Sequence, residues 1–133
     1  MDLETALTAA LQADAGVGAL VADRIYPQLV PQDATLPAIA YQVITTDGMH
    51  THNGTTPLVR ATVQLAIIAS TYATAKQIRT AAKTLLDNFK GVMGGVGGLQ
   101  IEECFVSNEV DGYNAGTSSK TVRMDLEILH QGE

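Results

Sequence analysis

Residues 59–68, VRATVQLAII, give the clearest secondary-structure signal in the chain and decide its fold class. Apolar residues alternate with the other side chains along the whole stretch, which is the period-two pattern of a strand with one buried face. The apolar set is Val59, Ala61, Val63, Leu65 and Ile67. The opposite set begins polar at Arg60 and becomes apolar at Ile68. This change predicts either burial on both faces at the end of the strand or a contact with another subunit.

A second strand and a long hairpin are predicted just before this one. Residues 38–45, AIAYQVIT, are rich in the β-branched and aromatic residues that favour strands. Between the two strands, residues 45–57 contain the turn dipeptides DG at 47–48 and NG at 53–54. We therefore expect a long β-hairpin with a mobile tip.

Two further strands are predicted near the end of the chain. Residues 99–110 alternate imperfectly between apolar and polar side chains, and residues 122–128 alternate cleanly. Between these strands, Asp-Gly at 111–112 and the segment 114–116 predict a turn.

Two amphipathic helices are predicted, one on each side of the hairpin. Asp2 is expected to cap the first helix, whose apolar residues recur at helical spacing over 3–11. A short second helical turn or a bend is expected over 17–21. The second helix is expected over 72–89. The glycine-rich residues 91–98 after it, GVMGGVGG, are expected to be a flexible connector.

The order of these elements predicts an α+β fold, with an antiparallel sheet of about four strands and two helices packed on one face. The other face must then meet water or neighbouring subunits. Residues 24–27, RIYP, are expected to run at a sheet edge or as a loop, because proline removes a hydrogen-bond donor from the ladder. The length of 133 residues suits a single domain over 1–133.

The composition argues against several classes of function. The net charge is −6, from 14 acidic and eight basic residues, and no basic cluster occurs, so sequence-specific nucleic-acid binding is not expected. No apolar run approaches the roughly 18 residues of a membrane span, and the N-terminus lacks the cationic region of a secretory signal. The single cysteine, Cys104, cannot form an intrachain disulfide and fits a reducing compartment.

The candidate metal ligands are His50, His52 and Asp47. Two histidines separated by one residue on a strand face the same way and could share a metal, with the nearby aspartate as a third ligand. This spacing without a further fixed ligand is also common in solvated polar loops. We therefore expect no metal and no other cofactor.

No catalytic residues are predicted. Cys104 has no adjacent histidine, which favours a buried and inert thiol. Glu102 and Glu103 are neighbours on a strand and so point to opposite faces. The glycines of 91–98 follow a helix and precede a strand, which is the reverse of a nucleotide-binding loop. The chain is expected not to be an enzyme, with a small metal-binding enzyme as the less favoured alternative.

Residues 24–46, RIYPQLVPQDATLPAIAYQVITT, resemble the tail-completion family of long-tailed bacteriophages. Members of that family resemble tail terminator and tail-to-head joining proteins. The similarity continues through RATVQLAIIAS at 60–70 and VRMDLEI at 122–128, so it covers nearly the whole chain.

The resemblance implies a structural protein that forms a ring, usually of six copies, at the head-proximal end of a phage tail. Such a ring caps the tail tube, ends its polymerisation and presents the tail for joining to the head. The implied partners are further copies of the chain, the tail tube protein and the head–tail connector protein. The implied location is the virion, and the host cytoplasm during assembly. The alternative within the same setting is a head-completion or neck protein.

The candidate interface residues lie in the hairpin 45–57, in the turn 111–119 and at the end of the central strand. They are Asp47, Met49, His50, His52, Asn53, Ile68 and Tyr113.

Overall fold

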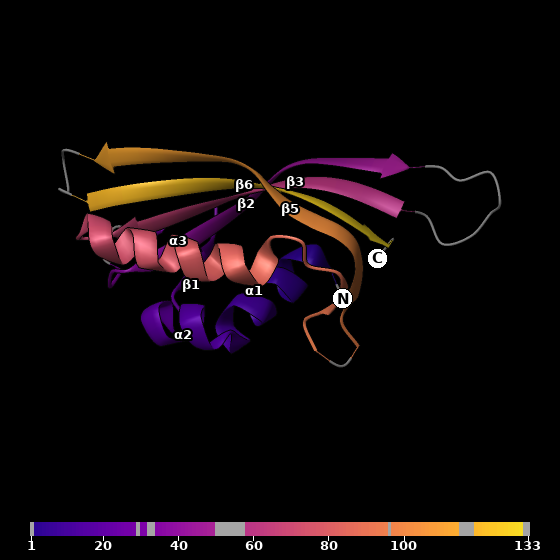
Figure 1. Ribbon diagram of the computed structural model, residues 1–133, viewed down its shortest axis with the longest axis horizontal. Helices are drawn as coiled ribbons and strands as arrows, with labels where there is room; N and C mark the ends of the chain where they lie inside the picture. The colour runs from indigo at the N-terminus through magenta and orange to yellow at the C-terminus, as the bar shows by residue number, and fades with distance from the viewer. Residues whose placement is uncertain are drawn as a thin grey trace.

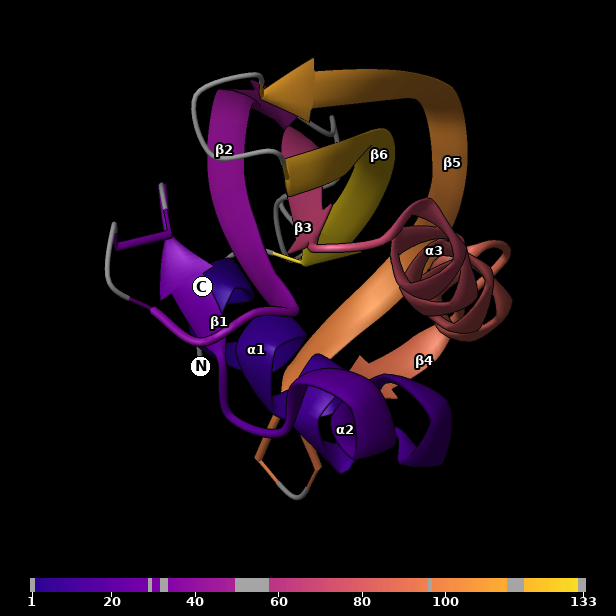
Figure 2. The ribbon, with the colours of Figure 1, turned by 90° about the vertical axis from the view of Figure 1, so that its left-hand side faces the viewer.

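The computed structural model describes residues 2–28, 30–31, 34–49, 58–95, 97–114 and 119–131. Within these residues the chain forms three helices and one six-stranded sheet, and the helices all lie on the same face of the sheet (Figure 1). In the end-on view of Figure 2, the sheet curls over the helices, and its two margins lie on opposite sides of the first helix. The α+β class predicted from the sequence is confirmed.

Four long strands form the body of the sheet, and each is antiparallel to its long neighbours. In sheet order they are β2 (Ala38–Met49), β3 (Leu58–Ala69), β6 (Ser119–Gln131) and β5 (Leu99–Asn114). They correspond to the four strands that the sequence predicts, although each is longer than predicted. The hairpin of β2 and β3 pairs as far as Met49 opposite Leu58, which confirms the predicted long hairpin.

The three helices of the described residues are α1 (Leu3–Ala13), α2 (Ala15–Val21) and α3 (Tyr72–Leu86). Each begins at an oxygen-bearing cap, Asp2, Asp14 or Thr71, whose side chain accepts a hydrogen bond from a first-turn N–H. α2 includes residues 17–21, for which the sequence predicted either a short helical turn or a bend. α3 ends three residues earlier than predicted, because the chain turns there and Asn88 N donates to Cys104 O at 2.7 Å.

Two short strands lie at the margins of the sheet, and the predicted count of about four strands did not include them. β1 (Ile25–Pro27) pairs parallel to β2 at the edge of the sheet. The sequence predicted either this edge position or a loop. β4 (Gly91–Met93) pairs antiparallel to β5, so the expectation of a flexible connector over 91–98 is wrong for its first three residues. A Cβ at Gly98 would collide with the carbonyl oxygen of Met93, so the chain after β4 makes a tight turn.

The turn predicted at residues 111–112 is also wrong. Asp111 pairs with Val122 and Gly112 pairs with Thr121, so β5 continues to Asn114. The ladder with β6 fixes these backbone groups in the strand, and this long-range pairing overrides the local turn preference of an Asp-Gly dipeptide.

The helices cover the apolar face of the sheet and close a single buried core with it. Each large apolar side chain that is fully buried in this core stabilises the fold by about 1.5–3 kcal/mol relative to the same side chain in water. The fully buried large side chains include Leu7 and Leu11 of α1, Leu65 and Ile67 of β3, Ile78 and Leu86 of α3, and Met124, Leu126 and Ile128 of β6. No helix of the described residues is long and apolar enough to cross a membrane.

Leu65→Ala tests this assignment of the buried face. The substitution removes a fully buried side chain from the centre of the core, so we expect a loss of about 2–5 kcal/mol in the free energy of unfolding, measured by chemical denaturation. The neighbouring Gln64→Ala is the matched control on the opposite face and should cost less than about 1 kcal/mol. Equal losses for the two variants would contradict the assignment.

Candidate assembly surface

The sheet has a second face, opposite the helices, which we call the outer face. Successive side chains of a strand point to opposite faces, so every second residue of β3 and β6 lies on it. Unlike their core-facing neighbours, these residues are not fully buried. On β3 they are Thr62, Gln64, Ala66 and Ile68, and the residues opposite them on β6 are Glu127, Asp125, Arg123 and Thr121.

One half of the outer face is polar, and cross-strand hydrogen bonds hold it. The Thr62 hydroxyl lies 3.1 Å from both carboxylate oxygens of Glu127, to which it donates. In the next pair of outer-face residues along β3 and β6, Gln64 Nε2 donates a hydrogen bond to Asp125 Oδ1 at 3.4 Å. Both carboxylates therefore accept hydrogen bonds from the neighbouring strand.

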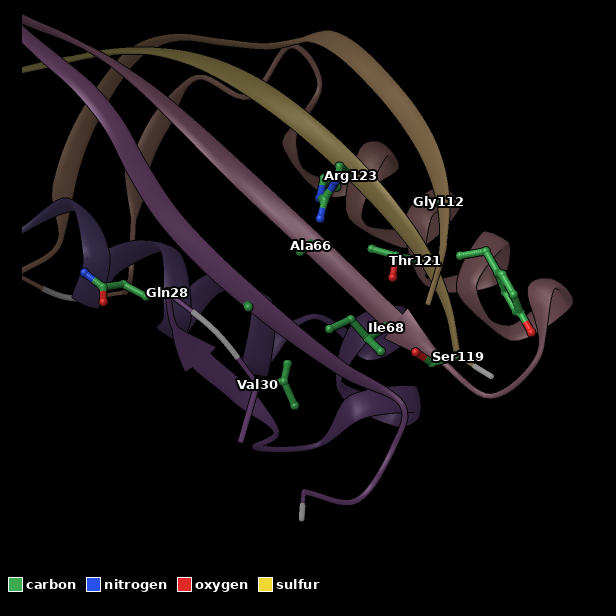
Figure 3. Close-up of a pocket in the computed structure, with 10 residues that line it drawn as sticks. Gln28, Val30, Ala66, Ile68, Gly112, Ser119, Thr121 and Arg123 are labelled. Atoms are coloured by element: carbon green, nitrogen blue, oxygen red, sulfur yellow. The ribbon is translucent and has the colours of Figure 1, made fainter. Parts of the chain in front are cut away.

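The other half of the outer face is more apolar and contains a hollow of about 540 Å³ (Figure 3). Ala40 of β2 lies opposite Ala66 of β3 at this place, and two methyl side chains on adjacent strands leave space above the sheet. We call this space the outer-face hollow. It is lined by Gln28, Val30, Ala40, Ala66, Ile68, Gly112, Tyr113, Ser119, Thr121 and Arg123.

Arg123 supplies the positive charge of the outer-face hollow. Figure 3 shows its side chain on the β6 side of the hollow, across from Val30. The ion pairs found among the described residues do not include Arg123. A guanidinium beside an apolar floor suits a carboxylate that is carried next to an apolar group. The sequence analysis missed this residue because it occupies an ordinary polar position in an alternating strand.

Two of the predicted interface residues, Ile68 and Tyr113, lie together in the lining of the outer-face hollow. They are 45 positions apart in the chain but both line the hollow, because only β6 lies between β3 and β5. The Tyr113 ring also lies under Lys120, with Nζ 4.2 Å from the ring centroid.

Two more of the predicted interface residues, Asp47 and Met49, lie at the opposite end of the sheet. Asp47 lies opposite Arg60, eight positions along β3 from Ile68, which corresponds to roughly 26 Å along a strand. Met49 is the last residue of β2. His50, His52 and Asn53 lie outside the described residues, so their role as interface residues stays a prediction.

The metal hypothesis also stays a prediction, because two of its ligands, His50 and His52, are outside the described part of the chain. Asp47 is exposed near the end of β2. Among the residues that the structure does describe, no group of three or more His, Cys, Asp and Glu side chains could hold a metal ion.

Cys104 is buried in the core, as the sequence predicts. Burial, and to a lesser extent the negative charge of Asp87, raises the pKa of its thiol to about 12. The thiol is therefore protonated at neutral pH and unsuited to nucleophilic attack. Glu102 accepts a hydrogen bond from Gln131 Nε2 at 3.2 Å, while Glu103 is exposed.

A charged cluster joins α3 to the far half of β5, and sequence reasoning did not find it. Asp111 accepts from Lys76 Nζ at 2.9 Å and from the Tyr72 hydroxyl at 2.8 Å. Glu109 lies 3.6 Å from both Arg79 Nε and Lys83 Nζ. Lys76, Arg79 and Lys83 of α3 are thus paired with β5. All six side chains lie at the same margin of the sheet.

Lys76→Met tests the contact to Asp111. The hydrogen bond from Lys76, followed by that from Tyr72, holds the pKa of the Asp111 carboxyl below its ordinary value. Its stabilising effect is present above the ordinary carboxyl pKa and is lost as the pH falls through the lowered pKa. In Lys76→Met we expect the Asp111 pKa to rise toward the ordinary value, measured by an NMR titration of side-chain carboxyl carbons.

The control for this titration is Asp2, whose pKa is lowered by hydrogen bonds from Thr5 and should not change. Tyr72→Phe should raise the Asp111 pKa by a smaller amount than Lys76→Met does. An unchanged Asp111 pKa in Lys76→Met would show that this contact does not form in solution.

Known proteins resemble this chain both in sequence and in fold. The family described as "Tail completion protein gp17" matches residues 5–131. A chain of the solved structure "Virion of native gene transfer agent (GTA) particle" superposes with a TM-score of 0.74. It is 17% identical in sequence, and the match covers 98% of the present chain and 95% of that one. No protein in the curated set is significantly similar in sequence.

Proposed function

We propose that this chain, which belongs to the tail completion protein gp17 family, is a structural protein that forms a ring on the end of a phage tail. The ring caps the tail tube, ends its polymerisation and presents the tail for joining to the head. The whole chain, residues 1–133, acts as one tail-terminator-like domain in this role.

The family match over residues 5–131 is the observation that carries this proposal. The solved chain with the same fold comes from a virion, which supports a place in an assembled particle. The outer face supports it independently. The helices cover only the opposite face of the sheet, so the outer-face hollow is open to other folded chains.

The partners that follow from this function are further copies of the chain, the tail tube protein and the head–tail connector protein. Arg123, in the outer-face hollow, fits a contact to an acidic residue on one of them. The net charge of −6 leaves acidic residues available on each copy. The protein acts in the virion, at the head-proximal end of the tail.

Deletion of the gene tests this function in a phage or prophage that encodes the chain. We expect electron microscopy of the lysate to show overlong tail tubes without heads, because tube growth is then not stopped. Expression of the chain in trans should restore tails of normal length with heads attached.

Tails of normal length that lack heads would instead indicate a head-completion or neck protein. Intact particles of normal length and infectivity would rule out both roles. His50→Ala together with His52→Ala tests the metal-binding alternative, which falls if tail length and head joining are unchanged and no bound metal is lost.

A further inference from the structure

The two margins of the sheet are only partly covered by their short strands. β1 pairs with Ile39, Ala40 and Tyr41 of β2, so residues 42–49 have a strand neighbour on the β3 side alone. β4 pairs with β5 only at Leu99 to Ile101. Beyond that point β5 has a strand neighbour on the β6 side alone.

The end of α3 bonds to the backbone of the β5 margin only as far as Val106, and beyond it α3 contacts the side chains of Glu109 and Asp111 but not the backbone. Asn88 N donates to Cys104 O at 2.7 Å, and Val106 N donates to Asp87 Oδ1 at 3.0 Å. Past Val106, no described residue outside β6 bonds to the β5 backbone. We call residues 42–49 the β2 free edge and residues 107–114 the β5 free edge. Each presents eight residues of unpaired strand margin, which can pair with a strand of another chain.

Exposed apolar side chains gather on these same edges. Ile44 of the β2 free edge is 48% exposed, while Val110 and Tyr113 of the β5 free edge are 50% and 58% exposed. Among the described residues, the other large apolar side chains with such exposure are Val92 in β4 and Tyr72 beside Asp111, both at the β5 side of the sheet. β3 and β6, in the middle of the sheet, carry no comparable side chain, so the margins are the more apolar part of the surface.

Val110 lies on the outer face, because it is opposite Arg123, which lines the outer-face hollow. Ile44 is the unpaired residue of the bulge between Val43, in the row of core-facing Val63, and Thr45, in the row of the outer-face Thr62. Its side chain is exposed, next to a residue of that outer-face row. If the two free edges joined in one continuous sheet, these two side chains would bury each other's apolar surface.

We propose that the β2 free edge of one copy pairs with the β5 free edge of the next, so that the sheet continues from subunit to subunit. This inference rests on the proposed ring. The strands alternate in direction across the order β2, β3, β6, β5, and a following β2 continues that alternation as an antiparallel pair. Each copy offers one edge of each kind, so the contact is heterologous and can close a ring.

The positions of the two edges also fix how neighbours are displaced. Ile44 lies between the rows of Val63 and Thr62, and Val110 lies in the row of Arg123 and Ala66. These rows are three to four residues apart on β3, so neighbouring copies are staggered by roughly 10–14 Å along the strands when Ile44 meets Val110. A closed ring accommodates such a stagger when its strands are tilted against the ring axis, as in β-barrels.

Cross-linking between cysteine variants in assembled tails tests the pairing. The gene deletion is complemented with Ile44→Cys, with Val110→Cys or with both on one chain, and purified tails are treated with a short bis-maleimide. The natural thiol, Cys104, is buried and protonated and serves as the unreactive background. We expect a ladder of cross-linked copies for the double variant, and dimers when the two single variants are coexpressed.

The single variants alone should give only monomers, because the edges that meet are different. Dimers from Val110→Cys alone would show that two β5 edges meet, and monomers from the double variant would show that the edges do not meet. Either result overturns the pairing. If tails in these samples still end at normal length, the proposed function survives while the edge pairing fails. Normal tails without any copy of the chain would remove the function itself.

A charge placed on either edge provides a second test. Ile44→Lys or Val110→Lys should reduce the fraction of chain incorporated into tails by roughly tenfold or more, because a lysine on an edge strand opposes pairing. Val92→Lys on the short strand β4 is the matched control and should stay within about twofold of the natural chain. Circular dichroism confirms that each variant is folded. Normal incorporation of both edge variants overturns the pairing.

Discussion

β3 and β6 pair in an unbroken antiparallel register, from Leu58 opposite Gln131 to Ala69 opposite Lys120. The neighbouring ladders contain bulges, at Val43/Thr45 and at two places in β5, but this one does not. Because side chains alternate between faces, a shift of one residue would turn the core-facing side chains of either strand outward. The buried core, the hydrogen-bonded polar half of the outer face and the hollow beside it all depend on this one register.

Much of this architecture can be predicted from local patterns, and the parts that cannot share a cause. The long strands and the amphipathic helices carry a period that repeats over many residues, so they are visible in the sequence. β1 and β4 have three residues each, too few for any period, and they are strands only because β2 and β5 pair with them. At Asp111 and Gly112 the local signal is a turn signal, and pairing with β6 overrides it.

In the candidate surface, too, only features that one segment carries by itself could be predicted from the sequence. Ile68 could be identified in advance, because an apolar residue at an outward position of a strand is conspicuous against its polar neighbours. Arg123 could not, since a charged residue at such a position is normal. The hollow needs Ala40 opposite Ala66, and the contact of Glu109 with α3 needs β5 placed beside that helix. Both are products of strand register and helix packing that no single segment encodes.

The position of Cys104 has a consequence for how copies of the chain behave when they are packed together. A lysed cell releases its contents from a reducing interior into aerated water, where accessible sulfur is oxidised or forms adventitious cross-links between proteins. The only sulfhydryl of this chain is on the buried face of β5 and keeps its proton, so it offers no thiolate to such chemistry. Copies of the chain can therefore be packed densely without a change in their covalent connectivity.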